Sequence, residues 1–512
     1  MVLVRLIGMV AAVHASGMGR HAGAVLQSDP PSIGPVNPDY RYASDDAVEA
    51  WHDLKFGLRI HWGEYCVHGL GPESWPLSRE HNITFLKWYW DQYKTWNPAA
   101  FDATQWISLM NTAGIKFFDF TLKHHEGFSM YDTNTDVHDC WDLRGPNAAI
   151  VPCCSSPGCR FPYSSMQAFG RDIAGELAAA ARAGGVKPGF YFSHIDWFDP
   201  DMRIDQWNAV ASAGKFCPAG TTCDPANYTN ATCPVEWGRF VLRHRAQIVE
   251  ALTKYGEIVE LSLDMQFPPI FNDAMQDTIM LARSIAPNTL FRGRGIGGTE
   301  QQGGFGDYET PEETFPASPL PGNWQVIFHG SDYMSYDPDP SHYVNGSFIV
   351  WHLADIVSKG GLMQIGYGPD ANGQFHPKAV EALEYAGRWM HNNGEAIYGT
   401  RPLSNRWQDP TTAEIRYTQK NGTIYAIYLD YGGDKFWGSP SHTLACVTPS
   451  AHSTTATLLG YTDDSTREPI PLKWSTDGGM TVVIPQPPGD PDSIPPPGFT
   501  IKIEGATVAK GC

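Results

Sequence analysis

The sequence predicts an α/β protein in which a (β/α)8-type barrel is followed by a C-terminal β-sandwich domain. Three observations predict it. First, 512 residues exceed what one hydrophobic core usually holds, so two domains are expected. Second, apolar strand-like runs alternate with helical patterns through most of the chain, which is typical of a parallel sheet. Third, from about residue 396 the pattern changes to short β runs broken by Gly, Asn-Gly and Pro. We therefore expect the barrel over residues 16–395 and the sandwich over 396–512.

Strands and helices follow one another in the predicted barrel. Runs rich in aromatic and β-branched residues predict strands at 54–63, 115–125, 186–198, 257–267 and 288–298. Apolar residues at helical spacing predict helices at 101–114, 169–185, 235–256 and 273–287. A closed barrel is the simplest arrangement for this alternation, and a doubly wound open sheet is the alternative.

The C-terminal part has strand patterns at 413–419, 423–431 and 454–461. The Pro-rich stretch 485–499 could be a linker, but strand-like residues follow it, so we interpret it as a loop inside the sandwich.

The first fifteen residues predict a secretory signal peptide, with one Arg before a short apolar stretch and cleavage after Ala15. Six of the ten cysteines lie between Cys140 and Cys223, which favours disulfides in an oxidising compartment. Zinc is the weaker alternative, because CCSSPGC lacks a paired C-x-x-C and a nearby His. Five N-x-S/T sequons are also present, at Asn82, Asn227, Asn230, Asn345 and Asn421. We expect a secreted or lumenal glycoprotein.

Charge and hydropathy exclude several partners. The net charge is −19, with 36 basic against 55 acidic residues and no basic cluster, which argues against nucleic-acid binding. After the N-terminal stretch there is no apolar run long enough for a membrane helix. A soluble protein with neither partner is expected.

Polar residues close the predicted barrel strands, where barrel enzymes carry their chemistry. They are His61 and Trp62, His124 and His125, Tyr191 and His194, Asp264, and Arg292 and Arg294. Each alone is more often a structural residue. Together, imidazoles, aromatic rings, arginine and a carboxylate favour a cleft for a neutral polyol held by directional hydrogen bonds.

Other chemistries fit less well. GRGIGG matches a dinucleotide-binding pattern, but no helix follows it. HHEGF contains two histidines, but neighbours on a strand point to opposite faces, and this argues against a metal pair. The sequence also lacks the G-x-S-x-G elbow of serine hydrolases. We expect no cofactor and no metal.

Several blocks together resemble glycoside hydrolase family 29, the α-L-fucosidases. They are KFGLRIHWGEY, the long block from WNPAAFDATQW to KHHEGFSMYDT, RGIGG…GDYETPE, GGLMQIGYGPDANG and NGEAIYGTRP. The resemblance implies a barrel followed by a sandwich, no metal, fucosylated glycans as substrates, and release of terminal α-L-fucose with retention of configuration. Retention requires two carboxyls, one ionised to attack and one protonated to release the leaving oxygen.

The resemblance also implies roles for single residues. Asp264 matches the nucleophile, and Glu312 matches the acid/base, with Glu309 and Glu313 as alternatives. The substrate-binding positions are matched by His61, Trp62, Trp88, His124, His125, Tyr191 and Arg294.

The chain departs from the family pattern at four positions, Lys87, Ser262, Gln325 and Gln364. The family usually has a carboxylate at the first position and Trp at the second, and both usually line the sugar pocket. Two alternatives therefore stay open: an exo-glycosidase for a related L-sugar, and a fucose-binding protein with impaired catalysis.

Overall fold

The computed structural model describes residues 40–79, 83–133, 163–199, 234–265, 272–404, 406–429, 441–462, 469–476, 479–484 and 498–512. The predicted signal peptide, the six clustered cysteines, three of the five sequons and most of the Pro-rich loop lie outside these residues.

Seven parallel strands form the main sheet of the described residues, in the order β5-β4-β3-β2-β1-β7-β6. Their bounds are β1 Phe56–Ile60, β2 Phe117–Lys123, β3 Lys187–Ser193, β4 Glu260–Asp264, β5 Leu290–Phe291, β6 Gln325–His329 and β7 Leu362–Gly366. β1, β2, β4 and β7 are buried along their whole length, which explains their near-continuous apolar sequences. The sheet is a TIM-like half-barrel, as the sequence predicted.

An irregular segment, residues 307–313, lies between the two edge strands, β5 and β6. Asp307 donates its backbone N–H to Phe291 at 2.8 Å, and Glu309 and Gln325 form a backbone hydrogen bond of 3.0 Å. Glu312 forms a single parallel bridge with Ile327. Pro311 has no N–H to donate, so a regular ladder cannot run through this segment. We call it the seam, because it joins the edges of the barrel where an eighth strand is expected.

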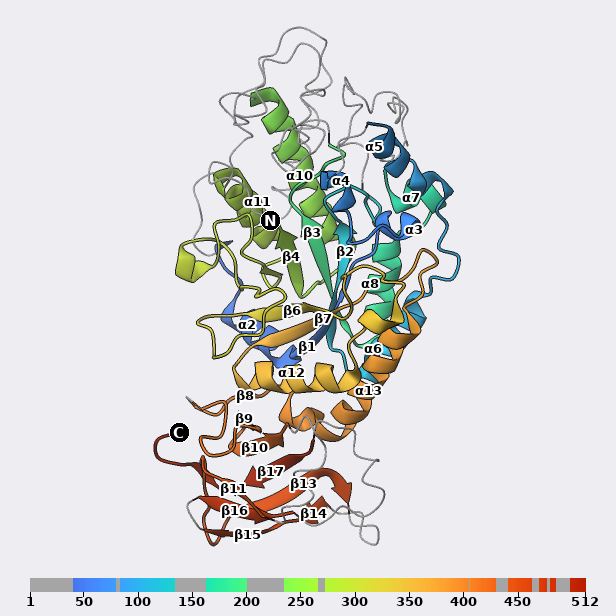
Figure 1. The fold of residues 1–512 in the computed structure, drawn as a ribbon. Coiled ribbons are helices and arrows are strands. Elements are labelled where there is room, and N and C mark those ends of the chain that lie inside the picture. The colour runs from blue at the N-terminus through green and yellow to red at the C-terminus, as the bar shows by residue number, and fades with distance from the viewer. Residues whose placement is uncertain are drawn as a thin grey trace.

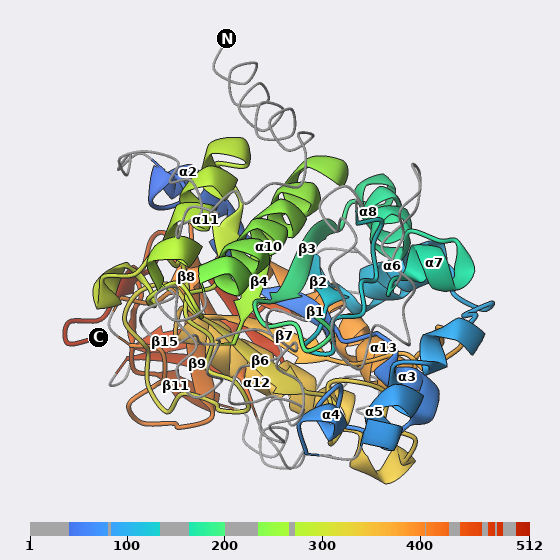
Figure 2. The same ribbon diagram turned by 90° about the horizontal axis from the view of Figure 1, so that it is seen from above.

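Helices surround the strands, as Figure 2 shows from above. They include α2 Asp45–Leu54, α6 Ala103–Ala113, α8 Ile173–Gly184, α10 Pro234–Lys254, α11 Asn272–Ile285, α12 Gly346–Ser358 and α13 Pro377–Asn393. Shorter helices precede α6: α3 Tyr65–His68, α4 Pro76–Arg79, α5 Ile83–Tyr89 and η2 Gln92–Thr95; α7 Ser165–Phe169 precedes α8. Helix ends follow sequence signals. In α6 the Asp102 side chain caps the first turn, and Gly114 ends the helix at φ 79°.

The C-terminal part is antiparallel and lies beyond α12 and α13, at the bottom of Figure 1. Its larger sheet has the order β14-β13-β17-β10-β9-β8, and a three-stranded sheet has the order β11-β16-β15. The bounds are β8 Arg401–Pro402, β9 Ile415–Lys420, β10 Thr423–Tyr428, β11 Ser441–Leu444, β13 Thr455–Thr462, β14 Pro469–Pro471, β15 Lys473–Thr476, β16 Met480–Val483 and β17 Thr500–Glu504. Two further strands, β12 Val447–Thr448 and β18 Thr507–Val508, pair with each other. The sandwich has its own core, which includes Tyr417, Leu444 and Ile501.

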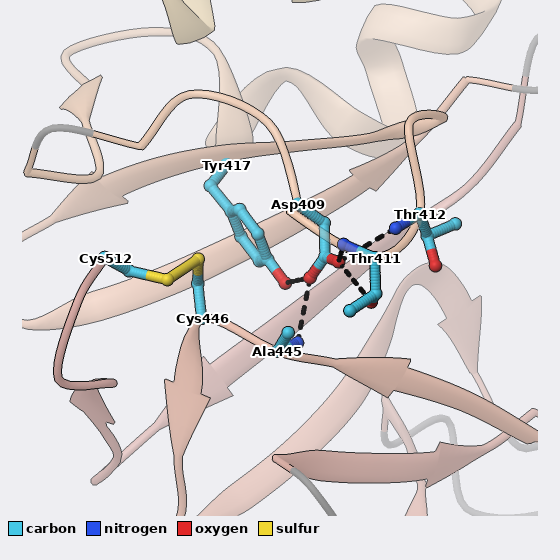
Figure 3. The surroundings of a disulfide bond; sticks show 7 residues. All are labelled: Asp409, Thr411, Thr412, Tyr417, Ala445, Cys446 and Cys512. Carbon is cyan, nitrogen blue, oxygen red and sulfur yellow. Dashed lines mark hydrogen bonds between the residues drawn. A yellow bond between two sulfur atoms is a disulfide. The ribbon is translucent and has the colours of Figure 1, made fainter.

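A disulfide between Cys446 and Cys512 ties the last residue of the chain to the sandwich (Figure 3). Beside it, the Asp409 carboxylate accepts hydrogen bonds from the Tyr417 hydroxyl at 2.6 Å and the Ala445 backbone N–H at 2.8 Å. The predicted use of cysteine in disulfides is confirmed for this pair. Cys66, in contrast, is buried and unpaired.

Among the described helices, none is both long and apolar enough to cross a bilayer. The division at residue 395/396 stays a prediction, although the last parallel strand, β7, precedes it and the antiparallel strands follow it.

Candidate active site

The histidines predicted from strand ends come together at the carboxyl end of the barrel. His61 follows β1, and its ring centroid lies 5.2 Å from that of His124, which follows β2. The His124 and His125 rings are 3.9 Å apart. They share one side because β2 ends at Lys123, so the rule that neighbouring strand residues alternate no longer applies to them. Our expectation of opposite faces was wrong at this pair.

Hydroxyl groups fix the orientation of two of these rings. The Thr121 hydroxyl donates to the Ile60 carbonyl at 3.0 Å, so it can only accept from Nδ1–H of His61, at 2.8 Å. In the same way, the Ser193 hydroxyl donates to the Ile195 carbonyl and accepts from His125. In both rings Nε2 is then left as a hydrogen-bond acceptor.

Burial keeps the histidines uncharged. It lowers the pKa of His125 to about 4, and those of His61 and His124 well below their ordinary value. Neutral rings suit a ligand whose groups are hydroxyls, because a hydroxyl can donate to the free Nε2. The His124 ring is held from behind by the Ser74 hydroxyl, 2.5 Å from Nδ1.

Asp264 is the last residue of β4 and lies next to this cluster. The Tyr191 hydroxyl, from β3, donates to its Oδ2 at 2.6 Å. The Tyr191 ring in turn lies 4.6 Å from that of His61 and is stacked on that of His124. Met265, directly after the carboxylate, has φ 73°, which is strained for a side chain of this size. A strained residue beside a functional group is typical of active sites.

Arg294 bridges Asp264 to a second carboxylate. Its Nη1 donates to Oδ1 of Asp264 at 2.8 Å, and its Nη2 donates to Oε2 of Glu312, on the seam, at 2.6 Å. Arg292 lies 3.5 Å from the Asp264 carboxylate and 3.4 Å from that of Glu312. Two arginines and two carboxylates therefore form one group at the mouth of the barrel.

Electrostatics hold both acids in their ionised form. Burial alone would raise the pKa of Asp264, but Arg292 and Arg294 outweigh it and hold that pKa well below its usual range. The pKa of Glu312 is also lowered, because the same arginines outweigh burial and the repulsion from Asp264. Asp264 is thus ionised, and Glu312 in this state has no proton to donate.

The neighbouring glutamates are placed differently. Glu313 accepts the His329 backbone N–H at 2.7 Å, and burial raises its pKa to about 7. Glu309 is paired with Trp324 along the seam. Of the three glutamates considered for the acid, Glu312 is the one bound to the arginine that also holds Asp264.

The two tryptophans have different surroundings. Trp62 is fully buried, packs among Trp96, Phe101 and Trp106, and donates its indole N–H to the Asp370 carbonyl at 3.0 Å. Trp88, at the end of α5, has 42% of its surface exposed. Its ring contacts those of His68 and Phe85, so its contacts link it to α3 and α5 rather than to the histidine cluster.

Three of the four departures from the family pattern are explained by the barrel core. Arg59, on β1, is buried and donates to the Ser262 hydroxyl at 2.8 Å and to the Gln364 side chain at 3.0 Å. Gln325 donates to the buried Glu260 at 2.8 Å. Ser262 and Gln364 therefore share Arg59 as a partner, and Gln325 and Gln364 share Glu260. Their effect on sugar recognition or catalysis stays a prediction. The Lys87 side chain lies outside the described part of the chain.

Some contributors were missed by sequence reasoning. Thr121 and Ser193 orient histidines, yet a hydroxyl within a strand gives no distinct pattern. Arg292 was noted only as a strand-end residue. Its spacing of two from Arg294 was the available signal, since residues i and i+2 of an extended segment share a face.

One group outside this site could hold a metal ion. Among the described residues, Asp332, Asp337 and His342 bring three ligand atoms within 4.8 Å of one another. None of them belongs to the arginine and carboxylate group.

Two carboxylates held by one arginine, at the carboxyl end of a parallel barrel, are an arrangement typical of a glycoside hydrolase. Comparison with known proteins gives the family. The family model described as alpha-L-fucosidase matches residues 34–395, so the chain belongs to the α-L-fucosidases of glycoside hydrolase family 29.

Relatives and solved structures agree with this assignment. The chain is 26% identical over 512 residues to the tissue alpha-L-fucosidase of Homo sapiens, with 94% of each chain covered. It is 26% identical over 477 residues to the alpha-L-fucosidase of Branchiostoma floridae, covering 88% of this chain and 91% of the relative. The fold is similar to that of alpha-L-fucosidase isoenzyme 1 from Paenibacillus thiaminolyticus, with a TM-score of 0.70, 24% identity and coverage of 92% and 100%.

Proposed function

We propose that this protein is a retaining exo-α-L-fucosidase that releases terminal α-L-fucose from glycans by double displacement. Asp264 attacks the anomeric carbon, and Glu312 first protonates the leaving oxygen and then activates water. The observation that carries the proposal is the bridge from Arg294 to both carboxylates. One guanidinium fork favours a short carboxyl separation, and retaining enzymes need about 5 Å.

The histidine cluster supplies recognition. His61 and His125 accept from sugar hydroxyls through Nε2, and His124 contacts a further hydroxyl. Tyr191 and Arg294 orient the nucleophile beneath the ring. The family resemblance also assigns Trp62 and Trp88 to substrate binding, but Trp62 is buried in the core and the ring contacts of Trp88 are with His68 and Phe85.

Glu312 must change state before it can act as an acid. Since its pKa is lowered in the free protein, the hydrogen bond from Arg294 has to break when the sugar binds. Arg294 is then free to turn fully to Asp264, which keeps the nucleophile ionised while Glu312 takes up a proton beside the uncharged, water-excluding substrate.

The proposal includes an extracellular or lumenal location. The Cys446–Cys512 disulfide supports an oxidising compartment.

The decisive experiment uses Asp264→Ala with an aryl α-L-fucoside. Turnover should vanish, and azide should restore it with inversion of the anomeric product, because the small anion occupies the space left by the carboxylate. Asp355→Asn, a change at a buried carboxylate on α12 that is bound to Arg416 instead, serves as a control for the loss of a buried charge. Full activity of Asp264→Ala would reject Asp264 as the nucleophile.

A further inference from the structure

His194 is buried at the end of β3 and has no role in the mechanism above. It joins two parts of the active site. Its backbone N–H donates to the Asp264 carbonyl at 3.0 Å, and its ring Nε2 lies 2.9 Å from the Arg294 carbonyl. One residue thus contacts the main chain of the proposed nucleophile and that of the arginine bridging the two acids.

The partners of His194 define its protonation. A carbonyl can only accept, so Nε2 of His194 must carry the hydrogen. Nδ1 then has a lone pair, and it lies 2.9 Å from Nε2 of His244 on α10, which must be the donor. Burial lowers the pKa of His194 to about 4 and that of His244 well below its ordinary value, so both rings are neutral. The hydrogen bonds therefore run in one direction, from His244 to His194 and from His194 to the Arg294 carbonyl.

The loop that carries Arg294 is shaped to receive this imidazole. Gly295 has φ 73°, and a Cβ at this position would lie 2.4 Å from Cδ2 of His194. Any larger residue would therefore push the loop away from the ring. Glycine allows the Arg294 carbonyl to approach Nε2, and it also adopts a backbone conformation that other residues disfavour.

We propose that His194 is a positioning residue, whose Nε2–H, held in place by His244, anchors the Arg294 loop to the end of β4 so that Arg294 can bridge Asp264 and Glu312. This inference rests on the proposed function, because it gives the bridge a catalytic purpose. The imidazole touches neither carboxylate; it acts through the main chain of the arginine.

The test compares His194→Leu, which removes the donor, with His194→Gln, whose amide can still donate at a similar reach. His442→Leu, in the sandwich, is the matched control for replacing an imidazole far from the site. The measurements are kcat and KM for an aryl α-L-fucoside across pH. We expect His194→Leu to lower kcat on the order of tenfold to a hundredfold, as misplaced catalytic groups do, and His194→Gln to recover most of it.

The acidic limb of the kcat/KM profile separates positioning from a general loss of structure. That limb reports the carboxyl of Asp264, which is faced by Arg292, Arg294, His125 and Tyr191. In His194→Leu a displaced Arg294 holds the carboxylate less firmly, so the limb should move to higher pH. A kcat and limb equal to wild type would overturn the proposal, and so would equal losses in the Leu and Gln variants with the limb unmoved.

Two further measurements keep the proposal testable. If His194→Leu does not fold, His244→Leu replaces it: the limb should move in the same direction by a smaller amount, and an unmoved limb overturns the proposal. If the wild type turns over no α-L-fucoside, the proposed function fails by itself. Crystal structures then decide the positioning role, which is supported if the Arg294–Asp264 hydrogen bond is lost in the variant and overturned if it persists.

Discussion

Replacing Arg294 tests whether the bridge between the two acids controls catalysis. Arg294→Leu removes a charged donor 2.8 Å from Asp264 and 2.6 Å from Glu312. Hydrogen bonds to charged groups contribute about 1.5–3 kcal/mol each. Only the bond to Asp264 involves the proposed nucleophile, and about 1.4 kcal/mol corresponds to a factor of ten. We therefore expect kcat/KM to fall roughly 10- to 150-fold at the optimum pH.

The sign of the pH effect follows from the charge. Arg294 lowers the pKa of Asp264, and Arg292 remains in the variant. Without Arg294 the pKa of Asp264 rises, so activity should be lost at a higher pH on the acidic side than in the wild type. Because its folded-state pKa is lowered, ionised Asp264 also stabilises the folded state at pH values above its unfolded pKa, and this stabilisation is lost as the pH falls. The stabilisation should be smaller in Arg294→Leu.

The assay is the initial rate on an aryl α-L-fucoside from acidic to neutral pH, with Arg294→Lys as the matched variant. Lysine keeps the charge but has one ammonium in place of a planar fork, so it cannot hold both carboxylates in the same way. In Arg294→Lys the acidic limb should therefore stay close to its wild-type pH, whereas kcat/KM should still fall. If Arg294→Leu leaves both the rate and the limb unchanged, the reasoning from the bridge is refuted.

Three other predictions concern single residues. Glu312→Ala should slow the hydrolysis of fucosides with poor leaving groups far more than that of activated aryl fucosides, because only the former need a proton. An equal loss for both kinds would contradict the role of Glu312 as the acid. The same selective loss in Glu309→Ala or Glu313→Ala would assign that role to Glu309 or Glu313. Burial raises the pKa of Glu126 to about 8, so the folded state keeps a proton that the unfolded state releases. The free energy of unfolding should therefore fall by about 1.4 kcal/mol per pH unit between roughly pH 4.5 and 8. Urea unfolding should show a flatter decline with pH for Glu126→Gln, and an unchanged slope would contradict this. Cys446→Ser removes the disulfide that closes a loop of 66 residues, and it should lower the unfolding free energy of the sandwich by about 4 kcal/mol. Denaturant titration measures the loss, and Cys66→Ser, which breaks no disulfide, is the control.

Much of the barrel could be predicted from the sequence, because its strands are continuous apolar runs and its helices carry their own caps. The expected strand at 115–125 contains β2, and the expected helix at 101–114 contains α6. The gathering of His61, His124, Tyr191 and Asp264 also followed from the rule that polar residues at strand ends meet at one edge of a parallel barrel.

The remaining features depend on contacts between residues far apart in the chain. Arg59 binds Gln364 across a sequence separation of 305 residues, and the local sequence around either residue does not predict this hydrogen bond. The hydrogen bond from Arg59 to Ser262 could not be predicted from the sequence for the same reason. The seam was missed for a similar reason, since residues 307–313 lack strand periodicity and acquire their place from the edges of β5 and β6.

The irregular seam separates Glu312, the proposed acid, from the strands that carry Asp264, the proposed nucleophile. Asp264 ends a strand bonded to β3 and β5, so moving it would shift neighbouring strands as well. Glu312 is attached by one isolated bridge to β6 and by Arg292 and Arg294, and no regular ladder runs through the chain on either side of it. The position of Glu312 can therefore change with the length of the seam, whereas the position of Asp264 is tied to the register of the parallel sheet.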